Sequence, residues 1–110
     1  MRKLSTLYSI VLEENKKFPL GSGNKFICNS IHYCEEEGLI SLAEKEKLFA
    51  HFYSQRPTGR LHKKFIKHGF CVGCSVTGAW WHLCGNTPDL EEGVKIREEF
   101  LTKMIKITNR

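Results

Sequence analysis

The stretch from Lys47 to Pro88 contains no aspartate and no glutamate. It does contain six of the 17 lysines and arginines, so the rest of the chain, with 11 basic and 12 acidic residues, has a net charge of −1. The net charge of +5 is therefore a local property of this stretch. A localised positive potential attracts anions such as phosphate, nucleic acid or an acidic protein face. We expect the binding surface of the protein to lie here.

The chain also lacks long apolar runs. No run approaches the ~20 residues that a membrane-spanning helix needs. The basic start, Met1–Leu4, is followed by an amphipathic segment and not by the apolar core of a signal peptide. We therefore expect a cytosolic protein that makes no contact with a membrane. Its 110 residues suit a single domain, residues 1–110, with a modest core.

No sequence typical of an active site is present. The chain has no nucleophile elbow, no H-E-x-x-H motif, no phosphate-binding P-loop and no pair of carboxylates within the acid-free stretch. Histidines are the acid–base candidates in that stretch, and histidine is common in purely structural roles. We therefore expect a binding protein and not an enzyme.

Apolar spacing and end signals predict a mainly α fold, a small helical bundle of about four helices. The approximate ranges are residues 4–18, 24–37, 41–54 and 89–108. Asn24 is a candidate cap for the second helix, and Gly38 is expected to end it in the left-handed region. Ser41 and Glu44 fit a capping box for the third. Between Pro57 and Pro88 the periodicity weakens, which predicts an irregular segment rich in cysteine and tryptophan.

A basic turn follows the third helix. Arg56 and Arg60 could hold a phosphate between their guanidinium groups, and Thr58 could add a neutral donor. The cluster continues with His62, Lys63 and Lys64. The alternative is a solvated basic loop that keeps the protein soluble. We expect a short helix at about residues 61–66 and a short extended piece at 70–72.

The cysteines suggest a metal site. Cys71 and Cys74 form a C-x2-C pair, which suits zinc because both thiolates can face one ion. His82 and Cys84 could complete a tetrahedral set, with His62 and His68 as alternative fourth ligands. Five cysteines without an export signal favour reduced thiols or a metal over disulfides. The alternative is that these cysteines are small core residues.

Two further features could contact a ligand. Of the adjacent Trp80 and Trp81, one is expected to anchor the loop and the other to stack on a base, an arginine or a partner, unless both cover the core. Arg97 falls on the apolar stripe of the last helix, where a buried arginine needs a partner. That partner could be a carboxylate such as Glu44 or Glu46, or an anionic ligand in a pocket.

A series of short motifs resembles small accessory proteins of tailed bacteriophages and prophages. The motifs are Gly38–Ser41, Glu44, His51–Phe52, Gln55–Thr58, Trp80–Trp81, Arg97 and Phe100–Leu101, and the similarity spans about residues 7 to 107. The resemblance implies a protein in the host cytoplasm that acts by binding against a host enzyme or defence system. The cysteine cluster is not part of the resemblance.

These observations predict a non-enzymatic phage protein that sequesters a phosphate-bearing ligand, a nucleotide or a nucleotide-derived defence signal. The first alternative is a zinc-stabilised nucleic-acid-binding module. The second is a protein–protein inhibitor that docks on a host factor. A symmetric homo-oligomer with sites between subunits is compatible with all three.

Overall fold

The structure, a computed structural model, describes residues 1–55, 59–67, 70–71, 82–83 and 91–109. Its elements, in chain order, are α1 (Leu4–Lys17), the 3-10 helix η1 (Gly23–Lys25), α2 (Ile27–Glu36), α3 (Leu42–Ser54), α4 (Gly59–Lys67), β1 (Phe70–Cys71), β2 (His82–Leu83) and α5 (Glu91–Thr108). The predicted helical bundle is confirmed. None of the helices within these ranges combines the length and the apolar character that crossing a bilayer requires.

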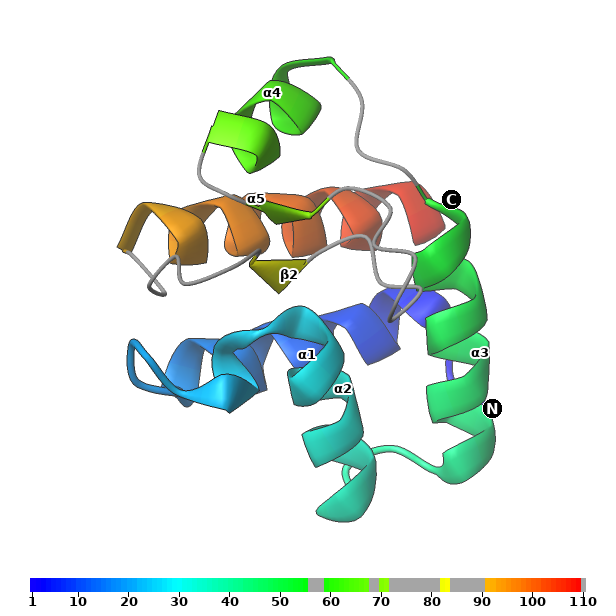
Figure 1. The fold of residues 1–110 in the computed structure, drawn as a ribbon. Coiled ribbons are helices and arrows are strands. Elements are labelled where there is room, and N and C mark those ends of the chain that lie inside the picture. Colours follow the sequence, from blue (N-terminus) through cyan, green and yellow to red (C-terminus); the bar gives the residue numbers. More distant parts are fainter. Residues whose placement is uncertain (56–58, 68–69, 72–81, 84–90, 110) are drawn as a thin grey trace.

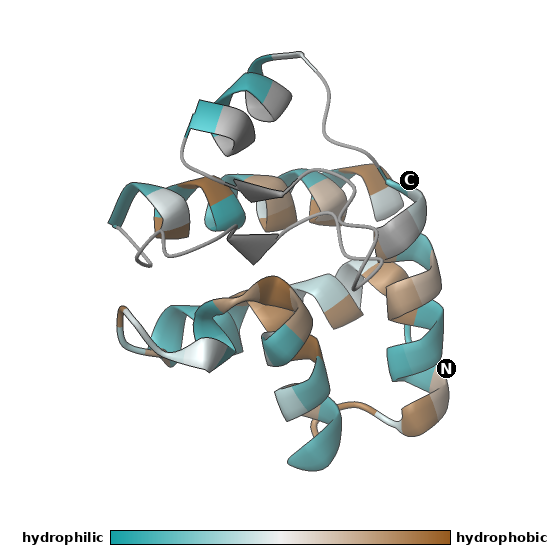
Figure 2. Cartoon of the chain, viewed as in Figure 1, coloured by the Kyte–Doolittle hydropathy of each residue, from teal (hydrophilic) through white to brown (hydrophobic). Residues whose placement is uncertain are grey.

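Helix α5 lies between α1 and α4 (Figure 1). Helices α1, α2 and α3 gather on one side of it, whereas α4 packs against α5 and β1. The coloured residues of α4 are all hydrophilic, whereas the other helices carry both hydrophilic and hydrophobic residues (Figure 2). One flank of α5 therefore faces the core, and another faces the charged helix α4.

The core joins α1, α2, α3 and α5 in one apolar cluster. Phe52 on α3 and Phe100 on α5 meet edge to face in it, with ring centroids 5.9 Å apart. On α5, Ile96 is 3% exposed and belongs to the core, whereas Val94 is only half-buried. Packing thus fixes the rotation of α5 about its axis, and with it the residues that α5 presents to α4.

The ends of α2 show one prediction that is confirmed and one that is wrong. Gly38 has φ +75°, the amide of Leu39 donates to the Cys34 carbonyl at 2.8 Å, and the Gly38 amide donates to Glu35. This is a Schellman end, which favours glycine because other residues are strained at positive φ. Asn24, however, does not cap α2. Its amide donates to the Ser22 hydroxyl at 3.3 Å, which starts a 3-10 turn, and α2 begins only at Ile27.

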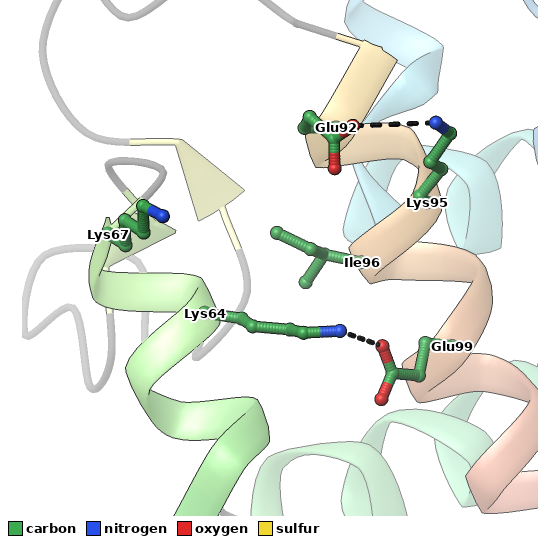
Figure 3. Close-up of a pocket in the computed structure, with 6 residues that line it drawn as sticks. All are labelled: Lys64, Lys67, Glu92, Lys95, Ile96 and Glu99. Atoms are coloured by element: carbon green, nitrogen blue, oxygen red, sulfur yellow. Dashed lines mark hydrogen bonds and ion pairs between the residues drawn. The ribbon is translucent and has the colours of Figure 1, made fainter.

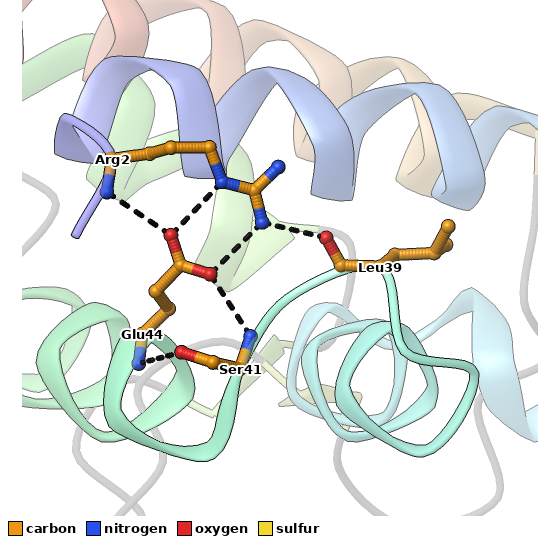
Figure 4. A network of polar contacts seen from close by, with 4 residues as sticks. All are labelled: Arg2, Leu39, Ser41 and Glu44. Carbon is orange, nitrogen blue, oxygen red and sulfur yellow. Dashed lines mark hydrogen bonds and ion pairs between the residues drawn. The ribbon is translucent and has the colours of Figure 1, made fainter.

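The predicted capping box of α3 is present and is extended by the chain start (Figure 4). Glu44 accepts a hydrogen bond from the Ser41 amide at 2.9 Å, and its own amide donates to the Ser41 hydroxyl. The Arg2 guanidinium donates to both oxygens of Glu44 at 2.9 Å and to the Leu39 carbonyl at 2.8 Å. The Glu44 carboxylate therefore joins the chain start to the α2–α3 connection.

This network predicts an acid-sensitive stability. Hydrogen bonds from the Arg2 side chain and the Ser41 amide hold the pKa of Glu44 well below its usual value of 4.5. The stabilisation is therefore fully present above that value and is lost as the pH falls through the lower pKa of the folded state. We expect the Glu44→Gln variant to melt lower than the wild type at pH 7 and to lose less stability on acidification. Thermal melts between about pH 7 and about pH 2.5 measure both effects.

Glu13→Gln is the matched control, because Glu13 is 66% exposed and pairs with Lys16 on the surface of α1. It should melt like the wild type across the same range, as exposed ion pairs contribute little. A difference in melting temperature between Glu44→Gln and the wild type that stays the same at every pH would contradict the role given to Glu44.

Candidate anion-binding site

Helix α4 presents its basic residues in one row. Arg60, Lys63, Lys64 and Lys67 are spaced at i, i+3, i+4 and i+7, so they share one face of the helix. Lys64 is half-buried and the other three are exposed. This α4 stripe holds four of the six basic residues of the acid-free stretch.

Helix α5 also carries a row of residues, all charged except one threonine, on the side that faces α4. Its members are Glu92, Lys95, Glu99, Thr102, Lys103 and Lys106, and we call them the α5 stripe. The spacing of three, four, three, one and three residues keeps them on one side of the helix. The buried positions, such as Phe100 and Leu101, lie on the core side. The stripe is therefore the surface that core packing leaves free to face α4.

Glu99 links the two stripes. Its Oε1 accepts a hydrogen bond from Nη2 of Arg60, and its Oε2 accepts one from Nζ of Lys64 at 2.9 Å. Figure 3 shows the Lys64 side chain reaching from α4 across to Glu99 on α5. The hydrogen bond from Lys64 is the main cause that lowers the pKa of Glu99. The carboxylate is therefore ionised at neutral pH and holds both cations at the seam between the helices.

Two depressions flank Glu99 along this seam. The first, here the Lys67 depression, has a volume of about 310 Å³ and is drawn in Figure 3. It is lined by Lys64, Lys67, Glu92, Lys95, Ile96 and Glu99. Ile96 is 3% exposed and supplies the apolar part of the lining, which also includes three lysines. An anion placed here would contact cations from both helices.

The second, here the Lys103 depression, has a volume of about 350 Å³. It is lined by Arg60, Glu99, Thr102, Lys103 and Lys106. Together the two depressions contain six basic residues and two acidic ones, a net charge of +4, against +5 for the entire chain. Three of the six cations, Arg60, Lys64 and Lys67, come from the acid-free stretch, and α5 supplies the other three.

Apart from Arg97, the residues predicted to bind the ligand divide into three groups. Arg60 and Lys64 line the depressions, and Lys63 is exposed on the same stripe. His62 belongs to α4, but its side chain is outside the described part of the chain. Arg56, Thr58, Trp80 and Trp81 also lie outside the described residues. Their predicted contacts with phosphate and base remain predictions.

Arg97 lies away from the seam. Its side chain is completely buried on the core side of α5, with the guanidinium carbon 5.6 Å from the centre of the Phe26 ring. Glu44, one of its predicted partners, instead binds Arg2 and Ser41. The structure thus places Arg97 in the core and not in either depression.

The strand pairing places two of the residues predicted to bind zinc. Strands β1 and β2 are antiparallel, with Phe70 opposite Leu83 and Cys71 opposite His82. Two of the four predicted ligands therefore occupy facing positions of one ladder. Cys74 and Cys84 lie outside the described residues, so zinc binding stays a prediction.

Sequence reasoning missed the contribution of α5. It followed the acid-free stretch and stopped at Pro88, although Glu92, Glu99 and Lys106 recur at intervals of seven residues. That spacing marks one helical face and could have indicated a second charged surface. No family model, no curated protein and no solved structure matches this chain, so its function is proposed from the site itself.

Proposed function

We propose that this protein is a non-enzymatic binding protein that captures a phosphate-bearing ligand on its α4–α5 seam. The observation that supports this proposal is the convergence of six basic side chains from two helices on two adjoining depressions. Arginine forms forked hydrogen bonds to phosphate oxygens, and lysine acts as a point charge beside them. Both kinds of group are present at this seam.

The ion pairs of Glu99 do not prevent ligand binding. The Arg60 side chain is 73% exposed and that of Lys64 is 39% exposed, and ion pairs in such positions contribute only about 0–1 kcal/mol. A phosphate carries about −1.5 to −2 charges at pH 7. Each hydrogen bond to a charged group contributes about 1.5–3 kcal/mol. A phosphate in either depression can therefore compete with Glu99 for hydrogen bonds from Arg60 or Lys64, and both cations already lie at the seam.

The same lining supports binding without catalysis. Lysine, arginine, threonine, isoleucine and two glutamates line the depressions, and each glutamate accepts a hydrogen bond from a lysine. None of these lining residues forms a nucleophile–base pair. The proposed ligand is a nucleotide or a nucleotide-derived defence signal, with Trp80 or Trp81 stacking on its base. The resemblance to small phage proteins supplies the setting, the cytoplasm of an infected host, where sequestration of such a signal counters defence.

Thermal melting with a ligand panel tests the proposal. The panel contains ATP, adenosine 3′,5′-bisphosphate, a cyclic dinucleotide and ADP-ribose, all at one ionic strength. A ligand present at about 100 times its dissociation constant adds about 2.7 kcal/mol to stability, which raises the melting temperature by roughly 10 °C in a domain of this size. Adenosine without phosphate is the control and should give no shift. A panel in which no phosphorylated compound raises the melting temperature would overturn the proposal.

A further inference from the structure

The two depressions are arranged in series along α5. The α5 residues of the Lys67 depression centre on Ile96, and those of the Lys103 depression centre on Lys103. These centres are seven residues apart, which corresponds to about 10 Å along a helix axis. This separation exceeds that of two phosphates joined by one bridging oxygen. The depressions meet at Glu99, which lines both, so two phosphates joined through a sugar can enter the near ends of both, whereas those of a pyrophosphate cannot.

Each depression has its own set of cations. The Lys67 depression has Lys64, Lys67 and Lys95, and the Lys103 depression has Arg60, Lys103 and Lys106. Each set has three positive charges, against two glutamates in the Lys67 depression and one in the Lys103 depression, so a phosphate meets a net positive lining in either one. In each set, residues of both α4 and α5 are present, so each phosphate would be held from two sides.

Glu99 stands between the two sets and lines both depressions. Its two oxygens accept hydrogen bonds from different cations, Arg60 on one side and Lys64 on the other. A continuous chain of phosphates laid across the seam would bring negative charge against this carboxylate. An uncharged spacer with hydroxyl groups, such as a ribose, would instead donate hydrogen bonds to it.

We infer that the ligand carries two phosphate groups separated by an uncharged, hydroxyl-bearing spacer, with one phosphate in each depression and the spacer over Glu99. This inference rests on the proposed function and narrows its ligand class. It favours nucleoside bisphosphates and short oligonucleotides over nucleoside di- and triphosphates. In this arrangement Glu99 selects the ligand by repelling a phosphate at the centre of the seam.

The test compares ligands that share adenosine but differ in phosphate placement. Isothermal titration calorimetry without magnesium measures ATP against adenosine 3′,5′-bisphosphate and 5′-phosphorylated diadenylate. ATP and the bisphosphate carry similar charge, so a difference in their affinities arises from the placement of the phosphate groups and not from total charge. We expect at least one of the two separated-phosphate ligands to bind at least ten times more tightly than ATP.

Single substitutions test whether the preference for separated phosphates arises from the two depressions. Lys95→Ala and Lys103→Ala each remove one cation from one depression. Each should lower the affinity for the preferred ligand about tenfold and lower the affinity for ATP by a smaller factor. Lys16→Ala on α1 is the matched control, because Lys16 is an exposed lysine whose ion pair lies within its own helix. Glu99→Gln should bring the affinities for ATP and the preferred ligand closer together.

The possible failures are distinguishable. If neither ATP nor the separated-phosphate ligands bind, the proposed function itself fails. If all bind, but ATP binds as tightly as the others, the proposed function stands and the two-phosphate inference is overturned. A tenfold preference that survives unchanged in both Lys95→Ala and Lys103→Ala would also overturn it, because the preference would then arise elsewhere.

Discussion

The Phe52→Ala variant is expected to lose about 3–5 kcal/mol of unfolding free energy, the largest effect of any single change considered. Phe52 is completely buried and meets Phe100 edge to face at 5.9 Å. Truncation removes the transfer free energy of the ring and leaves a cavity that surrounding side chains fill only in part. Because this contact joins α3 to α5, its loss also loosens the helix that carries half of the candidate site.

Urea titration or calorimetry measures this loss. Single domains are stable by about 5–15 kcal/mol, so the variant should melt roughly 15 °C lower or fail to fold. Leu42→Ala is the control on the same helix, since Leu42 is 57% exposed and surface changes stay within about 0.5 kcal/mol. Equal melting temperatures for the two variants would show that the α3–α5 contact is not part of the stabilising core. Phe52→Leu, which keeps most of the buried surface, should fall between them.

The parts of the fold that the sequence predicted correctly depend on local signals. The capping box at Ser41 and the left-handed Gly38 are each decided by residues within about four positions, and both are confirmed. The start of α2 was predicted wrongly at Asn24, because the Asn24 amide donates to the Ser22 hydroxyl and residues 23–25 form a 3-10 turn before α2 begins at Ile27. The residue before α2, Phe26, makes no side-chain cap, so no capping signal in the sequence marks this helix start.

Contacts between residues distant in sequence could not be predicted in this way. Arg2 binds Glu44 across 42 residues, and no periodicity connects them. Lys25 is only 4% exposed, although lysine is normally a surface residue. Its ammonium group donates to the Asn15 carbonyl at 2.7 Å, near the end of α1 where the helix dipole favours a cation. Such a burial becomes evident only when α1 and η1 are placed side by side.

The candidate site was predicted only in part, for a related reason. Charge counting identified Arg60 and Lys64, because they lie in the acid-free stretch. It passed over Lys95 and Lys103, because the acidic residues around them balance their charge in the sequence. In three dimensions the rotation of α5 separates its charged side from its core side, and its lysines join those of α4. The sequence alone does not show which face of α5 meets α4.

A double variant, Arg60→Ala/Lys64→Ala, is expected to lose at least 100-fold in affinity for the nucleotide that gives the largest melting shift. Each of the two cations is expected to form a charge-assisted hydrogen bond to phosphate worth about 1.5–3 kcal/mol. Two such losses amount to about 3–6 kcal/mol, and about 1.4 kcal/mol corresponds to a factor of ten. The melting temperature without ligand should change little, because both side chains are at least 39% exposed. Calorimetric titration measures the affinity, and melting curves establish that the variant is folded.

Glu99→Gln separates the two explanations that a loss of binding would leave open. The double variant removes two cations and also both ion pairs to Glu99. Glu99→Gln weakens the same ion pairs but keeps Arg60 and Lys64, and it removes the negative charge that competes with phosphate. If the cations themselves hold the ligand, this variant binds at least as tightly as the wild type while the double variant does not bind. If both variants lose affinity equally, Glu99 itself is needed for binding, and the loss in the double variant no longer supports direct contact between these cations and phosphate.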